Sequence, residues 1–92
     1  MSTNENAREV TVRYFAWVRE KVGLSEERVT VPPDVKTIGD LARWMQSRGD
    51  GYASAFAKPD AIRAAIDHKH VQALTQIGAA REIGFFPPVT GG

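Results

Sequence analysis

The sequence has 92 residues and contains no cysteine. Without thiols, the chain can form no disulfide, bind no metal through thiolates and offer no cysteine nucleophile. For the same reason it cannot carry sulfur as a persulfide on one of its own side chains.

An excess of charge of one sign is also lacking. Twelve basic and eleven acidic residues leave a net charge of +1, which gives no general argument for nucleic acid or an anionic membrane as partner. No apolar run is long enough to span a bilayer. Residues 1–9 are polar, without the apolar stretch of a secretory signal, so we expect a disordered leader on a cytoplasmic protein. No phosphate loop, carboxylate pair or nucleophile–base set is visible, and no catalytic residue is predicted.

What the sequence does contain is 42% hydrophobic residues, enough for one modest core. We expect one domain over residues 10–86. Val10, Val12 and Tyr14 alternate on one face of a first strand. Further strands are predicted at residues 29–31, at 62–66 with a short return from 71, and at 82–86.

Two helices are expected between these strands. A short one covers residues 16–22 and is stopped by Gly23. The main helix covers residues 37–47, with Thr37 as N-cap and Asp40 as the acid of a capping box. A helical turn is also possible near residues 52–57.

The order of these elements predicts an α+β fold with one main helix packed on one face of a mixed sheet. By analogy this is a β-grasp, or ubiquitin-like, architecture in which the first and last strands are parallel neighbours at the centre. The predicted core comprises Val10, Val12, Ile38, Leu41, Met45, Ile66, Ile83 and Phe85.

Strand alternation places two aromatic residues on the opposite side of the sheet. If Tyr14 and Phe85 face the helix, Phe15 and Phe86 face away from it and share one exposed surface. Grouped exposed aromatic residues are typical of a binding surface. The alternatives are that these rings tuck under a loop, or that the register slips by one residue.

The C-terminal segment, residues 87–92, reads as an extended tail. Pro87 and Pro88 stiffen the chain, and residues 89–92 can reach about 13 Å further. Gly91 and Gly92 lack side chains and could thread a narrow channel. The carboxylate of Gly92 could then be activated with ATP in a partner's active site. The alternative is a frayed end without function.

The C-terminal residues resemble those of a known family. Residues 85–92, Phe-Phe-Pro-Pro-Val-Thr-Gly-Gly, resemble the C-terminal signature of the small, MoaD-type subunit of molybdopterin synthase, in the ubiquitin-like superfamily. Residues 12–16, 37–41 and 64–67 match in kind and order. The resemblance implies a sulfur carrier that is not catalytic alone. Its Gly92 is adenylated, converted to a thiocarboxylate, and donates sulfur to cyclic pyranopterin monophosphate in molybdenum cofactor biosynthesis.

The same resemblance implies the partners and the site residues. An E1-like, MoeB-type adenylyltransferase consumes the ATP, and a large, MoaE-type subunit completes a heterotetramer. No bound cofactor, metal, nucleic acid or membrane is implied. The tail that threads the partner's active site is Val89, Thr90, Gly91 and Gly92. The implied partner interface is Phe15, His70, Phe86, Pro87 and Pro88.

Three features depart from the family pattern. Gly78-Ala79-Ala80-Arg81 stands where members often carry Gly-Asp-Glu, Asp67-His68 stands where they often carry Asn, and His70 replaces an apolar residue. His68 and His70 could bind a metal, but a solvated turn fits the pattern better. The alternatives for function are a β-grasp sulfur carrier for thiazole or tRNA thiolation, a ubiquitin-like modifier acting through Gly92, and an interaction module with an inert tail.

Overall fold

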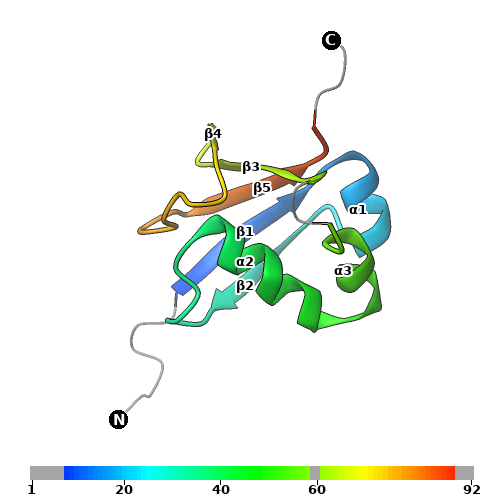
Figure 1. Cartoon of the computed structure of the whole chain (residues 1–92), viewed down its shortest axis with the longest axis horizontal. Helices are drawn as coiled ribbons and strands as arrows, with labels where there is room; N and C mark the ends of the chain where they lie inside the picture. The colour runs from blue at the N-terminus through cyan, green and yellow to red at the C-terminus, as the bar shows by residue number, and fades with distance from the viewer. Residues whose placement is uncertain (1–7, 59–60, 89–92) are drawn as a thin grey trace.

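The structure is a computed structural model that describes residues 8–58 and 61–88. Figure 1 shows the helices and strands in chain order. They are β1 (Arg8–Tyr14), α1 (Ala16–Val22), β2 (Glu26–Val31), α2 (Ile38–Met45), the 3₁₀ helix η1 (Gln46–Arg48), α3 (Asp50–Ala55), β3 (Arg63–Ile66), β4 (Lys69–Val71) and β5 (Glu82–Phe86).

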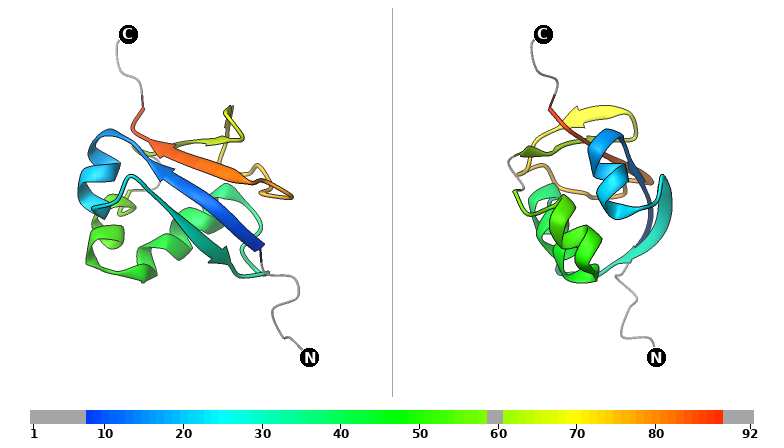
Figure 2. Two further views of the ribbon diagram at one scale, coloured as in Figure 1. Left: turned by 180° about the vertical axis from the view of Figure 1, so that it is seen from behind. Right: turned by 90° about the vertical axis from the view of Figure 1, so that its right-hand side faces the viewer.

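The strands form one mixed sheet in the order β2-β1-β5-β3-β4. β1 pairs antiparallel with β2 and parallel with β5, so the first and last strands are the central neighbours that the sequence predicted. β3 lies between β5 and β4 and runs antiparallel to both. Figure 2 shows α2 and α3, in green, on one side of the curved sheet. The predicted β-grasp fold is confirmed.

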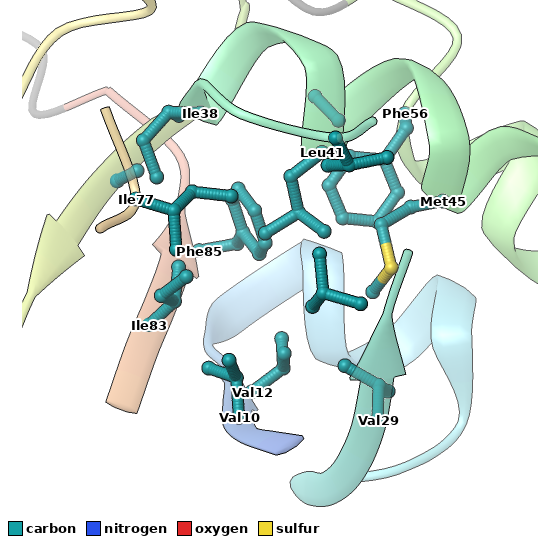
Figure 3. Close-up of a cluster of buried hydrophobic side chains, with 14 of the residues drawn as sticks. Val10, Val12, Val29, Ile38, Leu41, Met45, Phe56, Ile77, Ile83 and Phe85 are labelled. Carbon is teal, nitrogen blue, oxygen red and sulfur yellow. The ribbon is translucent and has the colours of Figure 1, made fainter. Parts of the chain in front are cut away.

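The core lies between α2 and the sheet, where the labelled side chains of Figure 3 point toward one another. Seven of the eight predicted core residues are at most 5% exposed. Ile66 is the exception and is only half-buried, because it is the last residue of β3 beside the exposed turn at Asp67 and His68. These apolar contacts are what hold α2 against the strands.

The start of α2 carries the predicted capping box. The Asp40 amide donates to Thr37 Oγ1 (3.0 Å), and the Thr37 amide donates to the Asp40 carboxylate (3.2 Å). The next two helix amides, of Ile38 and Gly39, donate to the carbonyls of Thr75 and Ala73. Because these amides have partners, α2 begins sharply at Ile38.

Several boundaries differ from the sequence-based expectation: β2 begins at Glu26 rather than at residue 29, and α2 ends at Met45 rather than at residue 47. The predicted leader, residues 1–9, ends too late, because β1 already begins at Arg8. Arg8 and Glu9 are held by pairing with Val31 and Thr30 of β2, and Arg8 Nη2 also donates to the carbonyl of Val35 (3.0 Å). Residues 1–7 lie outside the described part of the chain. The possible turn at residues 52–57 is the helix α3, which begins two residues earlier, at Asp50.

A polar cluster joins the edge strand β2 to the helical layer. Glu27 Oε2 accepts hydrogen bonds from the hydroxyls of Tyr14 (2.7 Å) and Tyr52 (2.6 Å) and from Arg48 Nη1 (2.9 Å). Burial opposes the charged carboxylate. The hydrogen bonds from Tyr52, Tyr14 and Arg48 outweigh that effect and lower the pKa of Glu27. The Arg48 guanidinium also lies over the rings of Trp44 and Tyr52. Glu27 therefore links β2 to β1, η1 and α3.

We expect Glu27→Gln to destabilise the protein at neutral pH by roughly 1–3 kcal/mol, since it removes the charge from three hydrogen bonds. The folded pKa of Glu27 lies below its ordinary value of 4.5, so its contribution is present above that value and is lost as the pH falls through the folded pKa. Urea unfolding at a series of pH values between neutral and about pH 3 measures this loss. The free energies of unfolding of Glu27→Gln and of the unmodified protein should converge as the pH falls.

Glu9→Gln is the matched control, because Glu9 forms only an exposed ion pair with Arg28. We expect it to change the free energy of unfolding by less than about 0.5 kcal/mol. A constant offset between the Glu27→Gln and unmodified curves at every pH would contradict the role given to Glu27.

Candidate functional site

The site begins where β5 ends. Phe85 is 1% exposed and points into the core, whereas the next residue, Phe86, is half-buried on the other side of the sheet. The register is therefore the predicted one, since a slip by one residue would have buried Phe86 instead. Pro87 and Pro88 follow, both half-buried. The remaining predicted tail residues, Val89, Thr90, Gly91 and Gly92, lie outside the described residues.

Phe15 lies on the same outer face, directly over Gly84. Its amide donates to the carbonyl of Phe85 (3.1 Å), and its own carbonyl accepts from the amide of Val18 at the start of α1 (3.1 Å). A Cβ added to Gly84 would come within 3.2 Å of Phe15 Cε2, so the ring covers the strand where no side chain stands. Phe15 remains 43% exposed.

His70 extends this surface across the sheet. The hairpin between β3 and β4 turns through Asp67 and His68, both with positive φ (48° and 75°), as a two-residue type I′ turn requires. This turn sets His70 opposite Ala65, which is itself opposite Gly84. The rings of His70 and Phe86 lie 5.0 Å apart between centroids. We call Phe15, His70, Gly84 and Phe86 the aromatic face.

Charged residues border the aromatic face on the β1 side. Arg13 stands opposite Gly84 in the register and bridges Glu26 and Glu82, each at 3.3 Å. These side chains are partly exposed, so the pairs contribute little to stability. The outer surface of the sheet thus carries charged side chains over β2, β1 and the start of β5, and the rings of Phe86 and His70 on β5 and β4. Arg63 of β3 stands opposite Phe86.

The opposite side of the sheet carries a groove of about 720 Å³ between α2 and the β3–β4 hairpin. Ile38 and Ala42 of α2 line it together with Ala64 and Val71. It lies on the helix side, whereas Phe86 leads into the tail from the outer face. We therefore place the candidate site at the aromatic face.

Comparison with known proteins shows the family to which the chain belongs. A sequence model of the ThiS family matches residues 12–92. The chain belongs to the ThiS family. It is 34% identical over 83 residues to the molybdopterin synthase sulfur carrier subunit of Escherichia coli (strain K12), covering 90% of this chain and 99% of that protein.

Solved structures in this fold extend the likeness. The HVO 2177 protein of Haloferax volcanii superposes with a TM-score of 0.75 at 23% identity, covering 100% of this chain and 93% of that one. The small archaeal modifier protein 1 of Methanosarcina acetivorans has a TM-score of 0.63 at 27% identity, covering 94% and 98%. The first likeness shows the fold alone.

Two of the departures noted in the sequence lie next to each other in this ThiS-family member. Asp67 Oδ1 accepts hydrogen bonds from the amides of Arg81 (3.2 Å) and Glu82 (3.0 Å). The Gly78–Arg81 loop turns at Gly78, which has φ +55°, and buries Ala80. Both segments meet at the start of β5, at the other end of the strand from Pro87. They support the strand and do not form part of the aromatic face.

Two further observations concern metal-binding side chains and membrane-spanning helices. Within residues 8–58 and 61–88, no three His, Cys, Asp or Glu side chains gather closely enough to hold a metal ion. His68 Nε2 lies 3.9 Å from Glu82 Oε2, while the ring of His70 contacts that of Phe86. Among the same residues, no helix has the length and hydropathy needed to cross a bilayer.

Gly84 is the site residue that the sequence analysis missed. A glycine inside a short apolar strand is a signal of close approach by another group. The group in question, Phe15, could be identified only from the register of β1 against β5.

We expect Gly84→Ala to displace the Phe15 ring outward, since the added methyl group would lie 3.2 Å from Phe15 Cε2. The ring is already partly exposed and can move, so the free energy of unfolding should change by less than about 1.5 kcal/mol. NMR shifts of the Phe15 ring protons, and their cross-relaxation with residue 84, would report the displacement. An unchanged Phe15 spectrum would show that the ring does not rest on Gly84.

Proposed function

We propose that this chain is the sulfur carrier subunit of a molybdopterin synthase. The observation that carries the proposal is the 34% identity to the carrier subunit of Escherichia coli, which extends over 99% of that protein. The ThiS family match continues through Gly92, so it includes the tail. The aromatic face beside the start of the tail supports the same function, because a partner that acts on the C-terminus must also bind the carrier domain.

The chemistry takes place at the carboxylate of Gly92. A carboxylate oxygen attacks the α-phosphate of ATP, pyrophosphate leaves, and an acyl adenylate forms. The terminal sulfur of a donor persulfide then attacks the acyl carbon, AMP leaves, and an acyl disulfide forms. A second thiol of the donor attacks the donor's own sulfur in that disulfide, which releases the thiocarboxylate and leaves a disulfide on the donor. Because the chain has no cysteine, the sulfur that it transfers must be held at this terminus. Among the described residues no catalytic set gathers at the aromatic face, so the partners would supply the catalytic groups.

Two partners are proposed for one surface. An E1-like adenylyltransferase of MoeB type activates the tail, and a large subunit of MoaE type uses the thiocarboxylate on cyclic pyranopterin monophosphate, in a heterotetramer. Both need the terminus, and four residues beyond Pro88 can extend at most about 13 Å. Each partner must therefore approach the domain near Phe86, and the two compete. Since the activation consumes ATP, we place the protein in the cytoplasm.

A second candidate function is protein modification through Gly92. The observation in its favour is the 27% identity, over 94% of this chain, to the small archaeal modifier protein 1 of Methanosarcina acetivorans. A modifier would be found in amide linkage to lysines of other proteins. A carrier would be found as free chain with a sulfur atom in place of one terminal oxygen. Mass spectrometry of the intact chain and of its conjugates separates the two.

We expect Phe86→Ala to weaken binding to the large subunit by more than about 1 kcal/mol while the thermal midpoint changes little. Phe86 is half-buried on the outer face, so the fold does not depend on it. Phe85→Ala is the matched variant, because its ring is 1% exposed and packs edge-on against Phe56. It should cost about 3–5 kcal/mol of stability. Calorimetric titration and thermal unfolding of both variants measure these effects. Unchanged affinity of Phe86→Ala would count against this surface.

We expect deletion of Gly92 to abolish sulfuration by the activating enzyme. The deletion withdraws the carboxylate by about 3.3 Å, and a misplacement of about 1 Å can already cost roughly 100-fold in rate. The assay is the intact mass of the chain after incubation with the E1-like enzyme, ATP and a sulfur donor. The unmodified chain should gain the mass difference between one sulfur and one oxygen atom.

The shortened chain should still bind the large subunit, since the aromatic face is intact. Leu74→Ala is a suitable control variant, because Leu74 is 88% exposed and belongs neither to the tail nor to the aromatic face. If the shortened chain supported molybdopterin formation at the normal rate, the carrier function would be wrong.

A further inference from the structure

His70 is the only ionisable member of the aromatic face. Its side chain is exposed on β4, and its ring lies 5.0 Å from that of Phe86 with the planes inclined by 47°. Among residues 8–58 and 61–88, Phe86 is the one aromatic or polar partner of this imidazole. A partner that covers Phe86 must therefore also cover His70, at least in part.

The charged groups near His70 do not favour a positive charge there. On β3, Arg63 shares the outer face and stands opposite Phe86 in the register. On β4, Lys69 precedes His70 and alternates to the other face. At the turn, Asp67 already accepts from the amides of Arg81 and Glu82, and His68 lies near Glu82. On β5, Glu82 is paired with Arg13. Phe86 and Gly84 are uncharged.

Covering this surface removes water from the imidazole. A neutral ring can pack against Phe86 and an apolar partner at little cost. An imidazolium would lose its hydration, and no acid within residues 8–58 and 61–88 is placed to replace it. Histidine is the side chain that changes its charge between about pH 5 and pH 8. A charged imidazole therefore opposes binding at this surface.

We infer that His70 is a recognition residue for the large subunit, which binds this chain most tightly when the imidazole of His70 is neutral. The inference rests on the proposed function, because it takes the aromatic face as the interface. It adds that acidification releases the carrier from its partner. It also assigns to the partner an apolar contact at His70, with no carboxylate opposite the imidazole.

The test is the affinity of the full chain for the large subunit from the same organism, measured by calorimetric titration between about pH 8 and pH 5.5. The affinity of the unmodified chain should fall by at least about fivefold over this range, with a limit of about tenfold per pH unit for one proton. His70→Gln removes the titrating group and should bind with a much flatter profile. His68→Gln is the matched control, because His68 lies two residues away and contacts Glu82 instead. It should keep the full pH dependence.

Thermal unfolding of the three chains at both ends of the pH range confirms that each is folded where it is titrated. A flat profile for the unmodified chain, a rise in affinity with acid, or the same profile for His70→Gln would each overturn the inference while leaving the carrier function standing. Loss of pH dependence in both histidine variants would also overturn it, since the effect would not belong to His70. Failure of the unmodified chain to bind the large subunit at any pH would overturn the proposed function as well.

Discussion

The parallel pairing of β1 with β5 is the contact on which the other features depend. The register that sets Tyr14 opposite Phe85 turns both rings into the core. The same register brings Phe15 over Gly84 and leaves Phe86 on the outer face. Because side chains alternate along a strand, the core and the aromatic face are two results of one alignment. A shift by one residue would exchange their positions and destroy both.

The sheet also separates stability from recognition. On the helix side, Leu41, Met45 and Phe85 pack closely, and Glu27 fastens β2 to Tyr52 and Arg48. On the outer side, Phe15 and His70 remain exposed, supported by a strand that has a glycine at its centre. Residues on the outer side can therefore change with small effects on folding, which allows one scaffold to serve different partners.

Much of the fold could be predicted because its signals are local. Alternation in residues 10–15 and 82–86, together with the capping box at Thr37 and Asp40, was sufficient for the strands, the helix and the inward direction of Phe85. The contact of Phe15 with Gly84 could not be predicted, because it depends on two strands far apart in sequence. The Glu27 cluster escaped detection for a related reason. A glutamate in the run Glu-Glu-Arg reads as solvated until Tyr14, Arg48 and Tyr52 are brought to it.

The arrangement of the two central strands also bears on how the domain responds to force. β1 enters the sheet at one end and β5 leaves it at the other, because the two strands run in the same direction. Tension between the start of β1 and the end of β5 would load their hydrogen bonds along the strands, all at once, in shear. The hydrogen bonds between parallel strands pulled in this way cannot break one at a time. Those of a hairpin pulled apart from its two ends can. An enzyme that pulls on the tail would therefore meet high mechanical resistance at its first step.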